Sequence, residues 1–444
     1  MRDAYHQPAM TTPITRTGID VAAVRDHFPS LARELNGRPI VFMDGAAGSQ
    51  VPRQTIDAME AYLLDRNANR GGQFVTSRET DAMVEEVRRA TADFLGAHLP
   101  EEIIFGPNMT TLTFGLSRAI ARELAAGDEV VVTELDHDAN VAPWVLAAEE
   151  RGAVVRRIGV NADDGTLALD RLESILGERT RLVALGLASN AVGTLNEIGR
   201  VVEMAHAFGA LVFVDAVHAA PHVPIDVVAL DADFLACSPY KFFAPHLGVL
   251  YGRRELLERL PAYRTRPAGE ALPGRWEPGS LPHELMAGLF GTFEYLEQLG
   301  RAYGDVDPGA DRRQSLRAAM SAIRRYERDL TGPMLQGLAA VPGLTIHGIS
   351  DPRRADERVP TFAITLSGHA PQAVARHLAE DGINAWDGNM YAPDLMRSLG
   401  LEDAGGVVRI GLLHYNTTKE VSRLVESLST LAEGSTRGIT LSAP

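Results

Sequence analysis

The sequence predicts an α/β fold, in which a large domain built on a mostly parallel sheet with helices on both faces precedes a smaller α+β domain. The chain has 444 residues, of which 45% are apolar and 23% charged, so it is long enough to bury two cores. Between Val41 and Tyr251, short apolar runs alternate with amphipathic stretches, as strands joined by crossover helices do. After a Pro- and Gly-rich stretch at Leu260–Pro282, the alternation of strand-like and helix-like runs stops, which favours a second domain.

Two kinds of sequence pattern predict the strands and the helices of the large domain. Short apolar or β-branched runs predict strands at Glu102–Phe105, Glu129–Thr133, Arg181–Leu187, Ala210–Val214, Asp233–Cys237 and Gly248–Tyr251. Apolar positions spaced three and four apart predict helices at Thr111–Ala125, Ala142–Arg151, Ala168–Leu176 and Ile198–Phe208. We expect the Leu260–Pro282 stretch to lie over a site or at a subunit border.

The rest of the chain predicts long helices followed by a second set of strands. Helices are expected at Glu284–Leu299, Gln314–Leu330, Pro371–Asp381 and Lys419–Leu431, and strands at Leu344–His347, Val359–Leu366 and Val407–Leu412. We therefore expect a disordered tail at residues 1–18, an N-terminal segment at 19–40 that packs with the small domain, a large domain at 41–300, a small domain at 301–435 and a flexible tail at 436–444.

Composition excludes several classes of partner. The formal net charge of −15 and the lack of unbalanced basic clusters argue against nucleic acid. No apolar run reaches the roughly 18 residues of a membrane span, and the first residues lack the apolar stretch of a signal peptide. The single cysteine, Cys237, excludes an internal disulfide framework, and no metal-ligand spacing is present, so we expect a cytoplasmic protein without a metal.

An acid and a lysine follow two of the predicted strands. Asp215 ends the run Ala210–Val214, and Lys241 follows the segment that begins at Phe234. A Schiff-base amine and a carboxylate that keeps a pyridine nitrogen protonated are what pyridoxal 5'-phosphate (PLP) chemistry requires. Each residue alone has an ordinary alternative, because a strand-terminal Asp is commonly a helix cap or a surface charge.

Three further features lie at carboxyl ends of predicted strands, where open α/β sheets bind ligands. Asn108-Met-Thr110-Thr111 opens a helix whose N-terminus suits a phosphate dianion, although an N-cap alone would look the same. The imidazole of His137 could stack on a pyridine ring, or be polar surface. The amide of Asn190 could reach the ring hydroxyl or a substrate carboxylate.

Together these residues resemble the class V aminotransferase family of fold-type I PLP enzymes, and within it the cysteine desulfurase and selenocysteine lyase subgroup. The likeness runs from about residue 40 to residue 431. It is carried by Asp44-Gly-Ala-Ala-Gly-Ser49, Met109-Thr-Thr111, His137-Asp-Ala-Asn140, Ser189-Asn-Ala-Val-Gly-Thr194, Asp215-Ala-Val-His218, Ser238-Pro-Tyr-Lys241, Trp276-Glu-Pro-Gly-Ser280 and Arg409. The resemblance implies a seven-stranded sheet in the large domain.

The resemblance also implies roles for the matching residues. Lys241 would form the Schiff base with PLP, Asp215 would pair with the pyridinium nitrogen, and His137 would stack on the ring. Arg409 would clamp the carboxylate of an amino-acid substrate. The remaining cofactor contacts would come from Thr110, Thr111, Asn190, His218, Ser238, Tyr240 and Ser280. In relatives a residue at the place of Ser280 reaches the phosphate of the other subunit, which implies a homodimer with shared sites.

The sequence departs from the subgroup at the pocket. His218 stands where the subgroup has Gln, Tyr240 where it has His, and Trp386 where an arginine is common. In the loop that carries the catalytic cysteine of true desulfurases, Tyr391 takes its place. Cys237 lies on a buried strand and is expected to be a core residue, so a persulfide mechanism is not expected.

Four functions remain open at this point. We favour a carbon–sulfur β-lyase in which Tyr391 is the acid near Cβ, and Asn190 and Trp386 help Arg409 to bind the substrate. The same phenol could return a proton from the opposite face, as in an epimerase resembling isopenicillin N epimerase. Transamination would need Lys241 alone as a proton shuttle. A non-catalytic scaffold would have no need for both Lys241 and Arg409.

Overall fold

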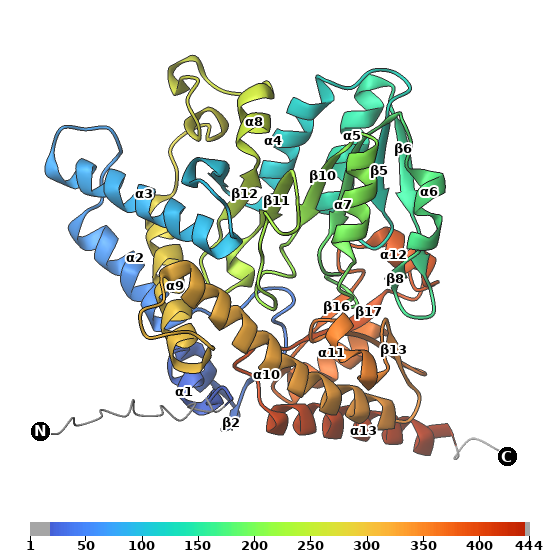
Figure 1. Ribbon diagram of the computed structural model, residues 1–444. Helices are drawn as coiled ribbons and strands as arrows, with labels where there is room; N and C mark the ends of the chain where they lie inside the picture. The colour runs from blue at the N-terminus through green and yellow to red at the C-terminus, as the bar shows by residue number, and fades with distance from the viewer. Residues whose placement is uncertain (1–17, 440–444) are drawn as a thin grey trace, which may run out of the picture.

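The computed structural model describes residues 18–439 and is built around a seven-stranded sheet (Figure 1). The strand order is β4-β12-β11-β10-β9-β5-β6. The strands are β4 Ile103–Gly106, β5 Glu129–Thr133, β6 Val154–Ile158, β9 Thr180–Gly186, β10 Leu211–Asp215, β11 Phe234–Cys237 and β12 Gly248–Gly252. All neighbours pair in parallel except β12, which is antiparallel to both β11 and β4. The predicted fold class and the seven-stranded, mostly parallel sheet are confirmed.

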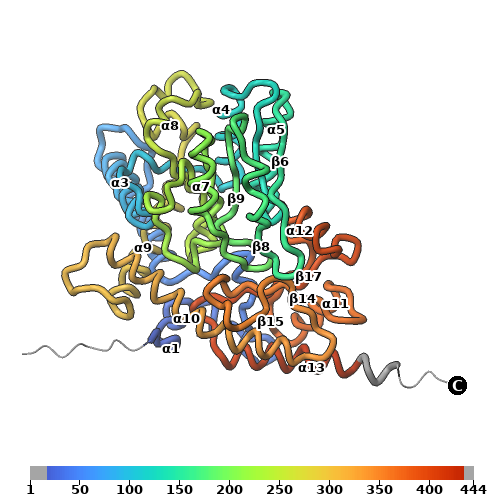
Figure 2. The backbone as a smooth tube through the Cα atoms, turned by 45° about the vertical axis from the view of Figure 1, so that its right-hand side comes forward, coloured from blue at the N-terminus to red at the C-terminus, as the bar shows by residue number. Residues whose placement is uncertain are grey.

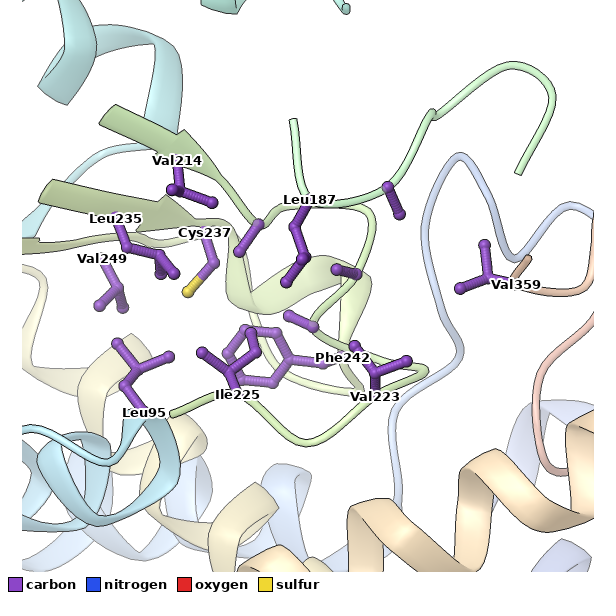
Figure 3. Close-up of a cluster of buried hydrophobic side chains, with 14 of the residues drawn as sticks. Leu95, Leu187, Val214, Val223, Ile225, Leu235, Cys237, Phe242, Val249 and Val359 are labelled. Carbon is purple, nitrogen blue, oxygen red and sulfur yellow. The ribbon is translucent and has the colours of Figure 1, made fainter. Parts of the chain in front are cut away.

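Helices cover both faces of this sheet because successive strand residues point to opposite sides. Val212 and Val214 of β10 belong to one buried cluster, together with side chains of α3 Val75–Leu95, α7 Ile198–Ala207 and α9 His283–Tyr303. Phe213 of β10 belongs to the other cluster, with α4 Met109–Ala121 and α5 Ala142–Arg151. Cys237 lies in the first cluster, among the side chains of Val214, Leu235, Val249 and Phe242 (Figure 3).

The small domain has its own sheet and core. Its strands are β13 Leu344–His347, β14 Thr361–Leu366, β16 Trp386–Gly388 and β17 Val407–Gly411, in the order β13-β14-β17-β16, and all pairs are antiparallel. The helices α10 Arg312–Ala340, α11 Pro371–Glu380 and α13 Thr418–Ile439 supply the other side of this core. In Figure 2 these elements lie below the large sheet, and α1 Val21–Asp26 lies beside them.

Residues 19–42 contact the small-domain part of the chain at several places. Strand β3 Val41–Phe42 pairs in parallel with β15 Ile383–Asn384. Arg25 forms an ion pair with Glu420 of α13, with 2.9 Å between Nη1 and Oε1. Helix α13 continues to Ile439, so residues 436–439 of the predicted C-terminal tail are helical. Residues 1–17 and 440–444 lie outside the described part.

Several elements were not predicted from the sequence. The edge strand β6 reads Val-Val-Arg-Arg-Ile and is mostly exposed, so it lacks the apolar run of its neighbours. The other strands and α-helices outside the prediction are β1 Glu34–Leu35, β2 Arg38–Pro39, β3, β7 Val160–Asn161, β8 Thr166–Leu167, β15, β16, α1 Val21–Asp26, α2 Arg53–Asp65, α3, α8 Arg254–Arg259 and α12 Pro393–Ser398. Helix α6 Leu172–Ile175 is the end of a predicted helix. Within residues 18–439, no helix combines the length and apolarity that crossing a bilayer requires.

Candidate active site

Lys241 lies at the carboxyl end of the sheet, in a short 3-10 turn, Pro239–Lys241, that follows β11. The side chain is 8% exposed, and its Nζ donates a hydrogen bond to the carbonyl of Ala46. Burial, followed by the charge of Arg409, lowers the pKa of this amine to about 7, and Asp215 opposes both effects. A large part of the Lys241 population therefore carries a free amine near neutral pH, which is the nucleophilic form.

Asp215 ends β10, the strand next to β11, and pairs with Ala236 across the parallel ladder. Its carboxylate accepts a hydrogen bond of 2.8 Å from the backbone N–H of Val217. Burial raises the pKa of Asp215 to about 6, and the charge of Lys241 counters part of that rise. The sheet thus brings the predicted acid and the predicted amine to one edge, and a cation at this place would keep Asp215 ionised.

His137 follows β5 and caps the turn that begins there. Its Nδ1 accepts a hydrogen bond of 3.0 Å from the backbone N–H of Ala139. Burial, followed by the charges of Lys241 and Arg409, lowers the pKa of His137 to about 4, so the ring is a neutral imidazole. A neutral imidazole at this position can stack on a heterocycle better than an imidazolium can.

Arg409 enters the same pocket from β17 of the small domain and is 6% exposed. Its Nη1 donates to the carbonyl of Asn190 at 2.9 Å, whereas its Nε has no partner within residues 18–439. Burial lowers the pKa of Arg409 to about 10. A buried guanidinium with an unused N–H is a ready partner for a carboxylate.

Asn190 is placed differently from the sequence expectation. Its Nδ2 donates to the carbonyl of Met390 at 2.7 Å, so one of its two N–H groups holds a small-domain loop. Its buried Oδ1 has no partner in the described residues and remains as an acceptor. His218 likewise uses Nε2, at 2.9 Å from Thr361 Oγ1, and leaves Nδ1 unpaired.

The predicted phosphate site lies at the N-terminus of α4. Asn108 caps this helix, accepting a hydrogen bond of 2.8 Å from the backbone N–H of Thr111, and Ser238 Oγ accepts from the N–H of Met109 at 3.3 Å. Gly248 is required here, because a Cβ on it would lie 2.5 Å from the backbone of Asn108. Thr110 is in the same exposed first turn. Helix N-termini of this length bind phosphate well.

Tyr240 and Ser280 flank this region. Tyr240 stacks on His246, with 4.7 Å between ring centroids, and its own centroid is 5.3 Å from Lys241 Nζ. Ser280 lines a cavity of about 840 Å³ that Thr111 and His246 also line. Ser280 and the predicted phosphate site therefore face a common space within a single chain.

Tyr391 and Trp386 lie at the small-domain side of the pocket. Tyr391 is 72% exposed, and its ring stacks on His137 with 5.3 Å between centroids and an interplanar angle of 15°. Its carbonyl accepts a hydrogen bond of 2.7 Å from the N–H of Asp138. Trp386 pairs with Arg409 across the β16–β17 ladder, which puts the two side chains on one face of that sheet.

Cys237 points away from this pocket. It is fully buried in the first core cluster, and burial raises the pKa of its thiol. A thiolate nucleophile is not available there. Within residues 18–439, no three or more His, Cys, Asp or Glu side chains are grouped as metal ligands.

Two signals at the site were missed in the sequence. Of the 43 basic residues only Lys241 and Lys419 are lysine, so one of the two lysines is the buried amine beside Asp215. Arginine cannot form a Schiff base, so these two lysines are the side chains that could form one. Asp136 is the second: its carboxyl accepts from Gly186 N–H at 2.8 Å, and burial together with the charge of Asp215 raises its pKa to about 8.

The residues present fit PLP. Lys241 lies close enough to Asp215 on the neighbouring strand and to the neutral His137 for their charges to interact, beside a helix N-terminus. Three buried polar atoms at this pocket, Asn190 Oδ1, His218 Nδ1 and Arg409 Nε, have no partner in the described chain. Buried polar atoms are otherwise paired in native proteins, so such a group of unpaired atoms indicates a polar ligand.

Comparison with known families agrees with this geometry. The family profile described as "Aminotransferase class-V" matches residues 41–302 and 314–424. The chain belongs to this family. Members are PLP-dependent enzymes, so this protein is a PLP-dependent enzyme with the fold-type I architecture.

Individual relatives carry related names. A probable cysteine desulfurase of Synechocystis is 34% identical over 92% of this chain and 94% of its own length. A probable cysteine desulfurase of Mycolicibacterium paratuberculosis is 32% identical over 97% of this chain, which spans 62% of that relative. The apo structure of a cysteine desulfurase from Thermococcus onnurineus superposes with a TM-score of 0.81 at 27% identity, covering 93% of this chain and 98% of the other.

Proposed function

We propose that this enzyme acts at the α-carbon of a small amino acid or amino-acid conjugate and cleaves a carbon–sulfur bond by β-elimination, without a persulfide-forming cysteine. The observation that carries the proposal is the buried Lys241 amine, whose charge interacts with Asp215 and with the partly unpaired Arg409. The names of the cysteine desulfurase relatives support sulfur chemistry. The buried thiol of the single cysteine supports a mechanism that does not use it.

Each residue has a proposed task. Arg409 binds the substrate carboxylate, with Asn190 and Trp386 beside it, and Lys241 removes the proton from Cα. Asp215 holds a proton at the ring nitrogen of the cofactor, and His137 stacks on the ring. The phosphate is held by Thr110, Thr111, Ser238, Tyr240 and Ser280, and His218 contacts the ring. PLP, when bound, supplies the electron sink that makes the Cα proton acidic. Tyr391 donates the proton that the departing sulfur takes up.

The lysine content makes the attachment test unusually direct. Borohydride reduction of the PLP-loaded protein, followed by peptide mass spectrometry, should place the cofactor on Lys241 and leave Lys419 unmodified. Lys241→Ala should lose the visible absorbance of the bound cofactor and all turnover. Lys419→Ala is the matched control and should keep both. A label on Lys419, or an active Lys241→Ala enzyme, would contradict the assignment.

Product analysis separates the lyase from its alternatives. Steady release of ammonia and pyruvate from a cysteine conjugate supports β-elimination. Exchange of the α-hydrogen with deuterated solvent, with inversion and no ammonia, would instead identify an epimerase. Formation of a keto acid only in step with an amino-group acceptor would identify an aminotransferase. An unreactive cofactor spectrum with every amino acid tested would favour the scaffold.

We further propose a cytoplasmic homodimer with shared sites. The cavity of about 840 Å³ beside Thr111 and Ser280 is lined largely by apolar side chains, including Phe114, Leu116 and Leu285. An apolar surface of this kind suits a second copy of the chain. Sedimentation should give twice the chain mass. If the sites are shared, mixing inactive Lys241→Ala with a Ser280 variant that is also inactive should restore activity through hybrid dimers.

A further inference from the structure

Two large aromatic side chains, Trp386 and Tyr391, are exposed beside the candidate site. Trp386 belongs to β16, Tyr391 lies three residues beyond the end of that strand, and they are 53% and 72% exposed. The other two tryptophans, Trp144 and Trp276, are buried. Sites for small molecules are lined mainly by apolar and aromatic side chains, so exposed rings next to such a site offer a surface that a ligand can cover.

The sheet of the small domain fixes the direction in which Trp386 projects. Val408 and Ile410 of β17 belong to the core of the small domain, whereas Val407 belongs to the cluster that also holds large-domain side chains. Because side chains alternate along a strand, Arg409 shares the face of Val407, which is turned towards the large domain. Trp386 is paired directly with Arg409 on the edge strand of this sheet, so its side chain lies on the same face.

This pairing places the indole next to the proposed carboxylate site. The Cβ atoms of directly paired residues are about 4.5–5.5 Å apart in an antiparallel ladder, so Trp386 begins beside the base of the Arg409 side chain. The Nε of Arg409 and the Oδ1 of Asn190 are buried and have no partner in the described part of the chain. A ligand that pairs these polar atoms therefore has an aromatic surface within reach.

Tyr391 is held at the same place by contacts that reach both domains. Its ring stacks on His137 of the large domain, with 5.3 Å between centroids, and its high exposure leaves the outer part of the ring open. The carbonyl of the preceding Met390 accepts from Asn190 at 2.7 Å, and the carbonyl of Asn190 accepts from Arg409 at 2.9 Å. A chain of hydrogen bonds thus fixes the Tyr391 loop relative to Arg409.

We propose that Trp386 and Tyr391 form a binding site for an apolar, aromatic group on the side chain of the amino-acid substrate. Arg409 holds the carboxylate of the same molecule, and the aromatic group extends from there against the two rings. Only the identity of that group rests on the proposed function, under which it is the substituent on sulfur. The substrate class is then an S-aryl or S-arylalkyl conjugate of cysteine.

The elimination balances for such a conjugate. The Cα–H and Cβ–S bonds break, the sulfur leaves with the bonding electron pair and takes up a proton, and a thiol with its aromatic group is released. Water hydrolyses the remaining enamine to ammonia and pyruvate. The thiol is a free product, so no cysteine of the chain has to accept the sulfur.

Binding can be measured apart from turnover with compounds that lack an α-hydrogen. The probes are α-methylcysteine with a benzyl group on sulfur and α-methylcysteine with a methyl group on sulfur. Each is titrated into the PLP-loaded enzyme, and the dissociation constant is read from the absorbance of the cofactor. We expect the benzyl compound to bind about tenfold more tightly or better, because its ring is covered on binding.

Variants of Trp386 test where the benzyl group binds. In Trp386→Ala the two dissociation constants should differ by less than about threefold, and Trp386→Phe should restore most of the preference. The ratio isolates the ring contact, because any effect of the variant on folding or on carboxylate binding acts on both compounds. Phe208→Ala is the control and should keep the wild-type ratio, since Phe208 is a partly exposed ring at the end of α7, before the opposite end of β10.

Tryptophan fluorescence gives a second measurement, because Trp386 is the exposed one of the three tryptophans. Acrylamide should quench it in the PLP-loaded wild-type enzyme, a saturating amount of the benzyl compound should protect it, and the methyl compound should not. If Trp386 were already shielded without a ligand, as when a second copy of the chain covers it, the proposal would be overturned.

The proposal also fails if the benzyl compound binds no better than the methyl compound, or if Trp386→Ala keeps the wild-type ratio. Release of ammonia and pyruvate from S-benzylcysteine tests the proposed function separately. Tight binding that depends on Trp386, without release of these products, would refute β-elimination alone. Release without the binding preference would refute the aromatic site alone.

Discussion

The ion pair between Arg88 and Glu277 provides the sharpest test of how this fold supports the site. Arg88 Nη1 and Nη2 lie 2.8 and 3.0 Å from the two carboxylate oxygens of Glu277, and the side chains are 1% and 5% exposed. Glu277 Oε1 also accepts from the N–H of Phe105 at 2.8 Å. The pair thus ties α3 to the segment that ends at Ser280 and to β4, which leads into the predicted phosphate site.

The cost of breaking the pair can be estimated for each partner. Arg88→Met leaves a buried carboxylate, but that carboxyl can take up a proton, and holding a proton on a glutamate at pH 7 costs about 3–4 kcal/mol. Glu277→Leu leaves a buried guanidinium that cannot lose its charge, for which about 3–5 kcal/mol is typical. Since domains are commonly stable by about 5–15 kcal/mol, either change should remove a large share of the stability.

The double variant Arg88→Met/Glu277→Leu distinguishes this reasoning from simple loss of packing. It removes both charges and leaves the N–H of Phe105 and the carbonyl of Ile103 without these partners, at about 1–3 kcal/mol for each buried group. Urea unfolding of the four cofactor-free proteins, followed by circular dichroism, measures the cycle. We expect the double variant to be at least as stable as the worse single variant. If the two single losses simply add, the charge-based account of this pair is wrong.

Three other perturbations have definite expected outcomes. Lys241→Met should raise the unfolding free energy of the cofactor-free protein at pH 7, because the pKa of the wild-type amine is about 7 in the folded state and much higher in the unfolded state. Between pH 7 and 10 only the unfolded wild-type amine binds a proton, so the stability advantage of Lys241→Met over wild type should shrink by about 1.4 kcal/mol per pH unit. Urea unfolding at several pH values measures this change. Arg358→Met should lower stability by about 3–5 kcal/mol in the same assay, because the buried guanidinium donates to the carbonyls of Val192, Ile349, Val359 and Thr361. Tyr391→Phe should lower turnover about 100-fold or more with the cofactor spectrum unchanged, since the ring stack on His137 remains; unchanged turnover would remove Tyr391 from the proton-donor role.

Sequence patterns predicted the framework because a parallel sheet imposes a regular pattern on the chain. Asp215 and Lys241 could be placed together since both follow strands, and the carboxyl ends of parallel strands share one edge. The edge strand β6 was missed because water, and not a core, covers much of it. Helix α2 has an amphipathic pattern, but it was missed because no side-chain cap marks its start.

The details of the site depended on contacts that no local pattern encodes. Asn190 and Met390 are 200 residues apart, so the use of the Asn190 amide to hold the small-domain loop could not be read from either segment. Met390 and Tyr391 have φ values of 57° and 54°, a left-handed conformation that usually calls for glycine or asparagine, and neither stands there. The place of Tyr391 over His137 follows from that backbone and not from a motif.

These unfavourable features are concentrated around one pocket. Met390 and Tyr391 both have a left-handed backbone, which costs about 1–2 kcal/mol for each non-glycine residue. The Met390 carbonyl accepts a hydrogen bond from Asn190, and the Tyr391 carbonyl accepts one from Asp138. The same pocket holds a buried amine whose pKa is lowered and three polar atoms without partners. A ligand that pairs these atoms would remove much of the penalty, and because it binds the folded state alone it would raise the unfolding free energy in proportion to the logarithm of its concentration. PLP should therefore stabilise the wild-type protein strongly and Lys241→Met only weakly, although Lys241→Met is the more stable of the two without the cofactor.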